Sequence, residues 1–138
     1  MLTRVPGRKL IYMRQNISGT SPYEPIIGFS RAVRVGNQVF VSGTGPSGAD
    51  DADAATQTKH ILAIAATILE RAGSSLEHVV RTRIFLANTE EWEAVGRAHG
   101  EVFGKILPAS SMVGAKLLNP KWHVEIELDA IIPDSKNN

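Results

Sequence analysis

The sequence predicts an α+β protein in which a mixed, largely antiparallel sheet carries two helices on one face. The first observation is the order of the expected elements: a strand, a hairpin, a helix, a strand, a helix and a final pair of strands (β-ββ-α-β-α-ββ). The second is that apolar and polar residues alternate in every expected strand, which argues against a doubly wound parallel sheet. The third is the length of 138 residues, which suits one domain. We therefore expect a single domain over residues 1–138, with loose tails at about residues 1–8 and 134–138.

The first part of the chain is expected to form an edge strand followed by a loop. Residues 9–14 alternate as an edge strand does. Residues 16–25 are rich in proline and small polar residues, so we expect no regular structure there. Tyr23 lies between two prolines of this loop, which makes the loop stiff enough to line a pocket. The alternative is that Tyr23 only holds the loop against the core.

A hairpin is predicted next, formed by residues 30–35 and 38–42 around a Gly-Asn turn that tolerates positive φ angles. Residues 43–48 then match G-x-G-x-x-G, the dinucleotide-binding fingerprint. We reject a dinucleotide site because a proline lies inside the motif and acidic residues follow it, where they would repel a pyrophosphate. These acids are interpreted instead as the N-cap and helix-dipole partners of the next helix: Asp50, Asp51 and Asp53.

Two helices are predicted on either side of a strand at residues 79–87. The first covers about residues 53–72 and ends at a glycine, and the second covers about residues 89–103. The apolar face of the second helix is expected to contain Trp92, Val95, His99, Val102 and Phe103.

Three residues of the second helix are unusual for its interior. Gly96 and Gly100 are unfavourable inside a helix, so we expect another backbone or a ligand to approach there. His99 lies on or beside the buried face. We interpret it as a hydrogen-bonded core residue, with a general acid or base as the alternative.

The last strand, residues 124–132, carries a row of acids on one face. Glu125, Glu127 and Asp129 alternate with apolar residues. Such a row is unfavourable unless cations or a subunit interface receive it, and Arg81 and Arg83 of the preceding strand are candidate ion-pair partners. Because two helices cover only one side of a sheet, the other side is expected to be the interface of a homo-oligomer.

Composition excludes several classes of function. The net charge is +1 with charges of both signs interspersed, and no basic-aromatic stripe is present, so a nucleic-acid partner is not expected. The chain lacks cysteine and any membrane-length apolar stretch, so we expect a cytoplasmic protein without a membrane partner. The histidines lack metal-ligand spacing. We expect neither a metal nor another cofactor.

The order and spacing of several short motifs carry a family resemblance. They are Ser-Pro-Tyr23, Gly-Asn37 before Val-Phe-Val-Ser-Gly43, Val-Val-Arg-Thr-Arg-Ile-Phe-Leu86, the helix at 92–103, Pro108-Ala-x-Ser, and Val-Glu125-Ile-Glu. From about residue 21 to 132 the chain resembles the Rid family of reactive intermediate deaminases, also called YjgF-type or L-PSP proteins. The resemblance implies a chorismate-mutase-like fold, a homotrimer with inward-facing sheets, and small-molecule pockets at the subunit interfaces.

The resemblance also implies a set of site residues. In deaminating members an arginine after Pro-Ala binds the substrate carboxylate, and a glutamate of the last strand positions the attacking water. The glutamate position matches Glu125, the catalytic candidate, and a pocket tyrosine matches Tyr23. The arginine position is Ser110, a cysteine position two residues later is Met112, and an asparagine position on the second helix is Gly96. The chain resembles a subgroup that has Gly-Arg-Ala-His on this helix and lacks the arginine.

Arg31 and Arg97 are candidate substitutes for the missing cation, and His99 is a further candidate for contact with the ligand. Three functions remain open. The first is a trimer that hydrolyses an imine, enamine or amide, with Glu125 orienting water. The second is a non-catalytic ligand sensor or protein-interaction trimer. The third is an endoribonuclease or translation inhibitor, which the near-neutral charge disfavours.

Overall fold

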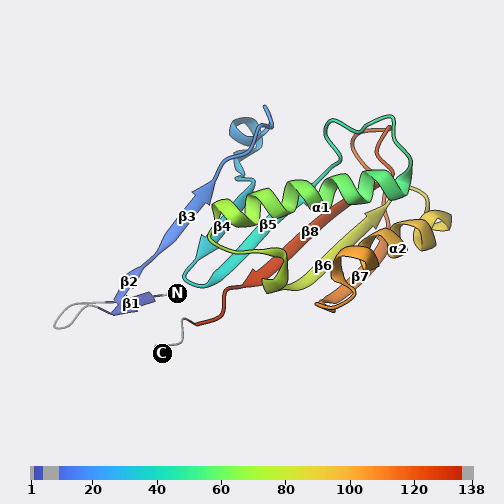
Figure 1. Cartoon of the computed structure of the whole chain (residues 1–138). Coiled ribbons are helices and arrows are strands. Elements are labelled where there is room, and N and C mark those ends of the chain that lie inside the picture. The colour runs from blue at the N-terminus through green and yellow to red at the C-terminus, as the bar shows by residue number, and fades with distance from the viewer. Residues whose placement is uncertain (1, 5–9, 135–138) are drawn as a thin grey trace.

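The computed structural model describes residues 2–4 and 10–134. It shows a six-stranded sheet with α1 (Ala54–Arg71) and α2 (Trp92–Phe103) packed on one face (Figure 1). The strand order is β3-β4-β5-β8-β6-β7, and all neighbours are antiparallel except β6 and β7, which are parallel. The predicted α+β fold is therefore confirmed. The strands of this sheet are β3 (Arg14–Ile17), β4 (Ala32–Val35), β5 (Gln38–Thr44), β6 (Val79–Leu86), β7 (Ala109–Gly114) and β8 (Val124–Ile131).

A second, two-stranded sheet lies near the N-terminus. It pairs β1 (Leu2–Arg4) with β2 (Leu10–Tyr12) in antiparallel register. The strand predicted at residues 9–14 is thus divided, because residues 10–12 pair with β1 whereas β3 begins at residue 14 and pairs with β4. Most of the predicted tails, residues 1, 5–8 and 135–138, lie outside the described part of the chain.

The loop before β4 is more regular than its composition predicts. Residues Glu24–Gly28 form a π-helical turn, η1, so the expectation of no regular structure up to residue 25 was wrong. The buried carboxylate of Glu24 accepts hydrogen bonds from the backbone N–H groups of Gly19 (2.9 Å) and Ser21 (3.2 Å). Pro25 follows at the start of the turn, where a missing N–H costs nothing. The carboxylate closes the loop on itself and fixes the position of its neighbour Tyr23.

The hairpin and the start of α1 follow the predictions closely. Gly36 makes the β4–β5 turn with φ of 60°, and Gly73 ends α1 with φ of 81°. Asp53 caps α1 by accepting a hydrogen bond from the Thr56 N–H at 2.8 Å. Asp50 and Asp51 do not cap the helix as expected. They accept hydrogen bonds from Trp122 Nε1 and Lys121 Nζ, both at 3.1 Å, and so join the loop before α1 to the loop before β8.

Asp53→Ala is expected to lower Tm by a few degrees, because it leaves the Thr56 N–H without its cap. The hydrogen bond from Thr56 lowers the pKa of Asp53 in the folded chain. A carboxyl group with a lowered pKa stabilises the fold above its unfolded-state pKa and loses that effect as pH falls through the folded-state pKa. The difference in Tm between wild type and variant should therefore shrink below about pH 4. Asp53→Asn, which keeps an acceptor, is the matched control, and a pH-independent difference would contradict this account.

The core lies between the helices and the sheet. The inward residues of β8 are at most 1% exposed, and they pack with fully buried residues of α1 such as Ile61 and Leu62. Val95 and Phe103 of α2 are also buried. Trp92 is not: it is 59% exposed, so its assignment to the apolar face was wrong. It is the first residue of α2, where the helix has only just left the preceding turn η3 (Thr89–Glu91).

Two 3₁₀ turns connect these elements. The 3₁₀ turn η2 (Leu76–His78) leads from α1 into β6, and η3 leads from β6 into α2. Among residues 2–4 and 10–134, all strands except β1 and β2 belong to the large sheet, and α1 and α2 both lie on one face of it, leaving the second face uncovered by either (Figure 1). We call this second face the open face.

Candidate functional site

Glu125 lies on the open face of the sheet. Its neighbours Val124 and Ile126 are fully buried on the helix side, so strict alternation along β8 turns Glu125 the other way. Farther along the same row, Arg83 Nη1 pairs with Glu127 Oε1 at 3.3 Å and Asp129 Oδ2 at 3.1 Å. Two of the three acids are thus ion-pair residues, whereas Glu125 lies next to a glycine and a different arginine.

The glycine is Gly43, at a β-bulge where the β5–β8 register shifts between residues 41 and 44. A Cβ atom at Gly43 would lie 2.3 Å from Oε2 of Glu125, far inside van der Waals contact. The lack of a side chain is what lets the carboxylate lie against the β5 backbone. The motif that was rejected as a dinucleotide fingerprint therefore contributes the backbone beneath this acid.

The arginine is Arg31, which precedes β4. Its Nη2 donates a hydrogen bond to the carbonyl oxygen of Gly43, and its guanidinium carbon lies 5.6 Å from the centre of the Phe29 ring. Its Nε is buried and has no hydrogen-bond partner in the described part of the chain. The structure therefore brings this candidate cation to Glu125.

The electrostatics of Glu125 and Arg31 are coupled. Burial raises the pKa of Glu125, the positive charge of Arg31 lowers it, and the negative charge of Glu127 raises it, with a net increase. Burial lowers the pKa of Arg31, while Glu24 and Glu125 raise it. A half-buried carboxylate with a raised pKa is a better proton acceptor than an exposed one. The arrangement suits a group that binds and activates water.

Tyr23 belongs to the loop that Glu24 closes. Its side chain is 60% exposed, and the neighbouring Ile26 and Ile27 are even more exposed. Tyr23 therefore does not hold the loop against the core of its own chain, which was the alternative interpretation. Its ring is free to contact a ligand or a second chain.

Ser110, Met112 and His99 form a second group, on the helix side of the sheet. Ser110 pairs with Thr82 in the β6–β7 register, and Met112 pairs with the buried Ile84. Thr82 Oγ1 lies 2.8 Å from Ser110 Oγ and 2.9 Å from His99 Nε2. Burial lowers the pKa of His99, so the ring is neutral at pH 7.

The space beside this second group is open. The nearest neighbour of a Cβ built at Gly96 is Met112 Cε at 3.8 Å, and at Gly100 nothing lies within 4 Å. The expectation that another backbone approaches these glycines is not met within the described chain. What Gly96 leaves is room next to Met112 for something outside this chain.

Arg97 belongs to neither group. It lies on the outer surface of α2, 78% exposed, and pairs with Glu93 one turn earlier at 2.8 Å. In this chain it is an ordinary exposed ion pair of the i,i+4 kind.

The two groups lie on opposite faces of the sheet. Thr82 and Ser110 share the helix side, whereas the Glu125 side chain is on the open face, level with Phe85 in the β6–β8 register. A small ligand in contact with Glu125 therefore cannot also reach Ser110 of the same chain. The structure brings Glu125 and Arg31 together, brings Ser110, Met112 and His99 together, and separates these two sets.

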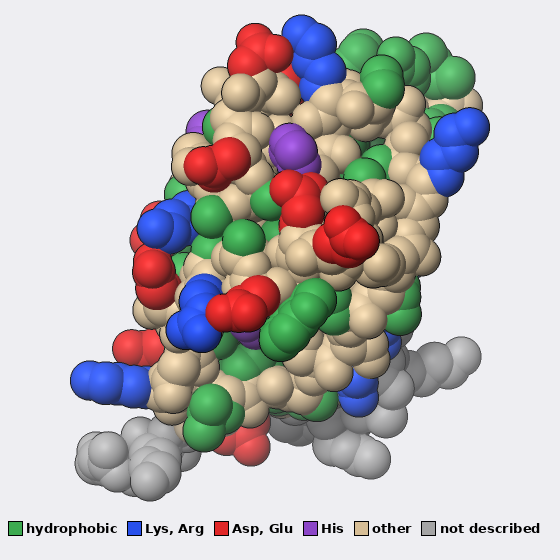
Figure 2. All heavy atoms as spheres, turned by 90° about the vertical axis from the view of Figure 1, so that its right-hand side faces the viewer, with side chains coloured by type: hydrophobic (Ala, Val, Ile, Leu, Met, Phe, Trp, Pro, Cys, Tyr) green, Lys and Arg blue, Asp and Glu red, His purple; other side chains and the backbone are tan. Residues whose placement is uncertain are grey.

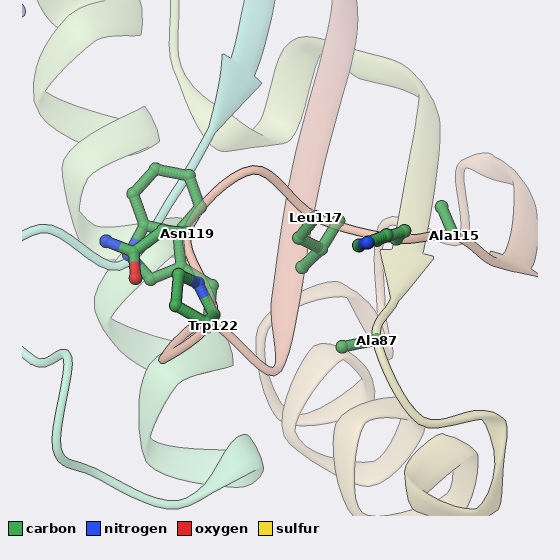
Figure 3. A pocket seen from close by; sticks show the side chains of 7 residues that line it. Ala87, Ala115, Leu117, Asn119 and Trp122 are labelled. Carbon is green, nitrogen blue, oxygen red and sulfur yellow. The ribbon is translucent and has the colours of Figure 1, made fainter.

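A pocket of about 310 Å³ lies at the end of the sheet where β6 and β7 finish and β8 begins. Figure 3 shows Trp122 and Asn119 on one side of it, with Leu117, Ala115 and Ala87 on the other. Lys116 and Pro120 complete the lining. No sequence motif marks this pocket, because its walls come from loop residues without periodicity.

Several features bear on partners. Within residues 2–4 and 10–134, no cluster of three or more His, Asp or Glu is placed to hold a metal ion. None of the helices in the described part of the chain has the length and hydrophobicity needed to cross a lipid bilayer. Figure 2, which views the right-hand side of Figure 1, shows acidic and basic side chains interspersed with hydrophobic ones. This side of the molecule has no continuous basic surface of the kind that binds a phosphate backbone.

Comparisons with known proteins agree with this architecture. The sequence model of the family described as Endoribonuclease L-PSP matches residues 19–132. The chain is 34% identical over 113 residues to the 3-aminoacrylate deaminase RutC of Acinetobacter baylyi, covering 78% of this chain and 88% of that protein. It is 31% identical over 121 residues to a 2-iminobutanoate/2-iminopropanoate deaminase of Dermatophagoides farinae, covering 79% and 89%.

Solved structures show the same fold. A member of the YjgF/YER057c/UK114 family from Mycobacterium tuberculosis matches with a TM-score of 0.81 and 43% identity, over 87% of this chain and all of that one. A YjgF-family protein from Neisseria meningitidis matches with a TM-score of 0.77 and 29% identity, over 89% and 98%. The class is therefore that of small α+β proteins with two helices on a six-stranded sheet. The chain belongs to the L-PSP family, also called the YjgF or Rid family, as the resemblance in its sequence predicted.

Sequence reasoning missed two residues of the two groups, Thr82 and Gly43, and one buried residue elsewhere, Gln57. Thr82 was assigned only to the alternation of its strand, although a hydroxyl among core residues is a signal that it has a buried partner. Gly43 was considered only as part of a rejected motif. Gln57 was not considered, yet it is fully buried in α1.

Gly43→Ala is expected to reduce any activity that depends on Glu125 by at least about tenfold, because the new methyl group displaces the carboxylate. Stability should change less, since the φ angle of Gly43 is one that alanine can adopt. The measurement is turnover beside thermal unfolding, with Gly100→Ala as the matched control on an open helix surface. Wild-type turnover in Gly43→Ala would show that the exact position of Glu125 is unimportant.

Proposed function

We propose that the protein is a homotrimer that binds a small metabolite in pockets between subunits and hydrolyses an uncharged imine, enamine or amide. Glu125 is the catalytic residue in this proposal: its carboxylate accepts a hydrogen bond from water and orients that water toward the carbon of the C=N or C=O group. The observation that carries the proposal is the half-buried Glu125 carboxyl beside Arg31, with its pKa raised by burial. Such a group accepts a proton more readily than a surface carboxylate.

The location of the pocket between subunits is supported by the separation of the two groups. Glu125 and Ser110 face opposite sides of one sheet, so a ligand that touches both must take them from two chains. The open face also retains exposed hydrophobic residues, among them Phe40 (43% exposed) and Ile131 (44%), beside the Arg83 ion pairs. Mixed apolar and paired polar composition is typical of a subunit interface.

The choice of an uncharged substrate is supported by Ser110. The two relatives named above are deaminases of compounds that carry a carboxylate, and the resemblance places an arginine at this position in deaminating members. A serine offers one neutral donor instead of a charged bidentate pair, which weakens carboxylate binding by a few kcal/mol at about 1.5–3 kcal/mol per charged hydrogen bond. Arg31 is not free to replace it, because its guanidinium donates to the Gly43 carbonyl oxygen and its charge is offset by Glu125.

A non-catalytic ligand sensor is the second candidate, and the serine at position 110 is what favours it. Such a sensor would keep the inter-subunit pocket and use Glu125 and Arg31 only to bind the ligand. The endoribonuclease role in the family description is disfavoured by the net charge of +1 and the interspersed charges of Figure 2.

Turnover of a matched pair of imines tests the proposal. The imine of 2-oxobutanamide and the imine of 2-oxobutanoate, each formed in situ, differ only in the charge of one end. We expect the imine of 2-oxobutanamide to release ammonia faster than in the uncatalysed reaction. The imine of 2-oxobutanoate should be hydrolysed poorly. Light scattering on the same sample should give three chains per particle. Binding of the ketone amide without any ammonia release would instead favour the sensor, and cleavage of RNA by the same clean preparation would favour the third function.

A further inference from the structure

Three side chains from three different elements form a continuous chain of hydrogen bonds. His99 comes from α2, Thr82 from β6 and Ser110 from β7. The His99 Nε2 to Thr82 Oγ1 distance is 2.9 Å, and Thr82 Oγ1 donates to Ser110 Oγ at 2.8 Å. These hydrogen bonds run from the half-buried ring of His99 through the fully buried hydroxyl of Thr82 to the exposed hydroxyl of Ser110 at the edge of the sheet. We call these residues the relay.

Each hydroxyl of the relay has a single hydrogen, which limits the directions that its hydrogen bonds can take. All three side chains are satisfied together when His99 Nε2 carries the ring hydrogen and donates to Thr82, and Thr82 donates to Ser110. In this arrangement Ser110 accepts from Thr82, and its own hydrogen remains available to another acceptor. Ser110 makes no second side-chain hydrogen bond in the described part of the chain. The outer end of the relay is therefore a free hydrogen-bond donor.

The surroundings hold the relay in this state. Thr82 has no exposed surface, so its hydroxyl has no access to water and depends on its two partners. The His99 ring packs against Phe103 at 4.6 Å between centres, which fixes its orientation. Burial keeps the ring neutral, with one hydrogen to place. Met112, two positions after Ser110 in β7, lies with its Cε 3.8 Å from a Cβ built at Gly96.

We propose that His99 and Thr82 orient Ser110 so that its hydroxyl donates to the carbonyl oxygen or imine nitrogen of a small uncharged ligand. Ser110 contacts the ligand, and His99 and Thr82 are positioning residues that act through it. This inference rests on the proposed function and deepens it: the relay supplies one directed neutral donor, which suits an amide or imine and does not compensate a carboxylate charge.

The first experiment needs no ligand. ¹⁵N NMR of the imidazole nitrogens, with His99 assigned by its absence in His99→Gln, should place the ring hydrogen on Nε2 in the wild type. In Ser110→Ala the hydrogen of Thr82 is free to turn toward Nε2, so the population with hydrogen on Nδ1 should rise. A wild-type ring with its hydrogen on Nδ1, or a ring unaffected by Ser110→Ala, would overturn the relay.

The second experiment measures binding of 2-oxobutanamide, with 2-oxobutanoate as the charged counterpart. We expect Ser110→Ala, Thr82→Val and His99→Leu each to weaken amide binding by about fivefold, the loss of one hydrogen bond. The double variant Ser110→Ala/His99→Leu should be no weaker than Ser110→Ala alone. His99→Gln, whose amide nitrogen can occupy the position of Nε2, should stay within about twofold of the wild type.

The controls separate this inference from simple loss of packing and from failure of the proposed function. Thr58→Val removes another fully buried threonine hydroxyl, which donates to Ala54 O in α1 far along the chain, and should leave binding unchanged. Additive losses in the double variant would overturn the relay even if the amide is a substrate. Absence of binding by either probe would overturn the ligand class, and the NMR result alone would then decide whether the relay exists. Amide binding and relay behaviour without turnover would refute only the hydrolase.

Discussion

Glu125→Gln is expected to lower the rate of imine hydrolysis by about 100-fold while leaving the affinity for 2-oxobutanamide within about twofold. The amide of glutamine has nearly the shape of the carboxylate, so it still fits over Gly43. It no longer offers a basic oxygen to an attacking water. The measurement is steady-state ammonia release for kcat, with a separate titration of the ketone amide for binding.

Glu127→Gln is the matched control for this variant. Glu127 lies two residues farther along the same row, on the same face, and pairs with Arg83. We expect its loss to leave kcat within about threefold, because the Glu127 carboxylate is held by Arg83 and has no part in orienting the water. Equal losses in the two variants would indicate that the acidic row acts through assembly and that Glu125 has no specific role in hydrolysis.

The Glu125→Gln variant also changes the stability of the fold, in a direction set by the pKa of Glu125. Burial raises that pKa in the folded chain, so the folded state binds this proton more tightly than the unfolded state. The contribution of Glu125 to stability is then complete below its unfolded pKa and is lost as pH rises through its folded pKa. At pH 7 the variant should therefore have a higher Tm than the wild type, and the difference should vanish toward pH 4. Catalytic loss with gain of stability is the expected signature of a functional carboxylate.

Gln57→Leu is expected to destabilise the fold by about 3 kcal/mol or more, lowering Tm by roughly 10 °C. The Gln57 side chain has no exposed surface and makes four hydrogen bonds to backbone groups of two loops. Its Nε2 donates to the carbonyl oxygens of Ala49, Asp50 and Lys121 at 3.1–3.3 Å, and its Oε1 accepts from His123 N at 2.7 Å. Leucine fills similar volume but leaves these buried groups without partners.

Thermal and urea unfolding measure this effect, with Gln15→Leu on the exposed strand β3 as the matched control. The control should change the free energy of unfolding by less than about 0.5 kcal/mol. Because Gln57 links the loop before α1 to the loop before β8, the variant should also loosen the walls around Trp122, seen as faster amide exchange in residues 115–123. A Gln57→Leu protein as stable as the control would show that water satisfies these groups.

Much of the fold follows from alternation alone. The acids of β8 were predicted on one face because single apolar residues, Ile126 and Leu128, separate them, and the structure places them there. Arg83, one of the two arginines expected as partners, pairs with two of them. Gly36 and Gly73 end their elements for the local conformational reasons that made them recognisable. Both features depend either on residues close together in the sequence or on which face of a strand a residue occupies. Sequence periodicity predicts features of these two kinds.

The arrangement of the candidate site could not be obtained in this way. That Ser110 meets Thr82 depends on the register of two strands separated by a whole helix, and no local pattern fixes that register. Whether Arg31 or Arg97 accompanies Glu125 depends on the β-bulge at Gly43 and on an ion pair with Glu93. Trp92 was misplaced because helical periodicity does not show where a helix extends beyond the sheet it covers.

The opposite-face placement of Glu125 and Ser110 has a genetic consequence under the proposed assembly. Each chain would contribute two halves to two different pockets, one half with Glu125 and the other with Ser110. A chain with Glu125→Gln keeps an intact Ser110 half, and a chain with Ser110→Ala keeps an intact Glu125 half. When the two chains share a trimer, at least one of its pockets receives both intact halves. Two alleles that are each defective alone would then complement one another in the same cell, whereas two alleles altered in the same half would not.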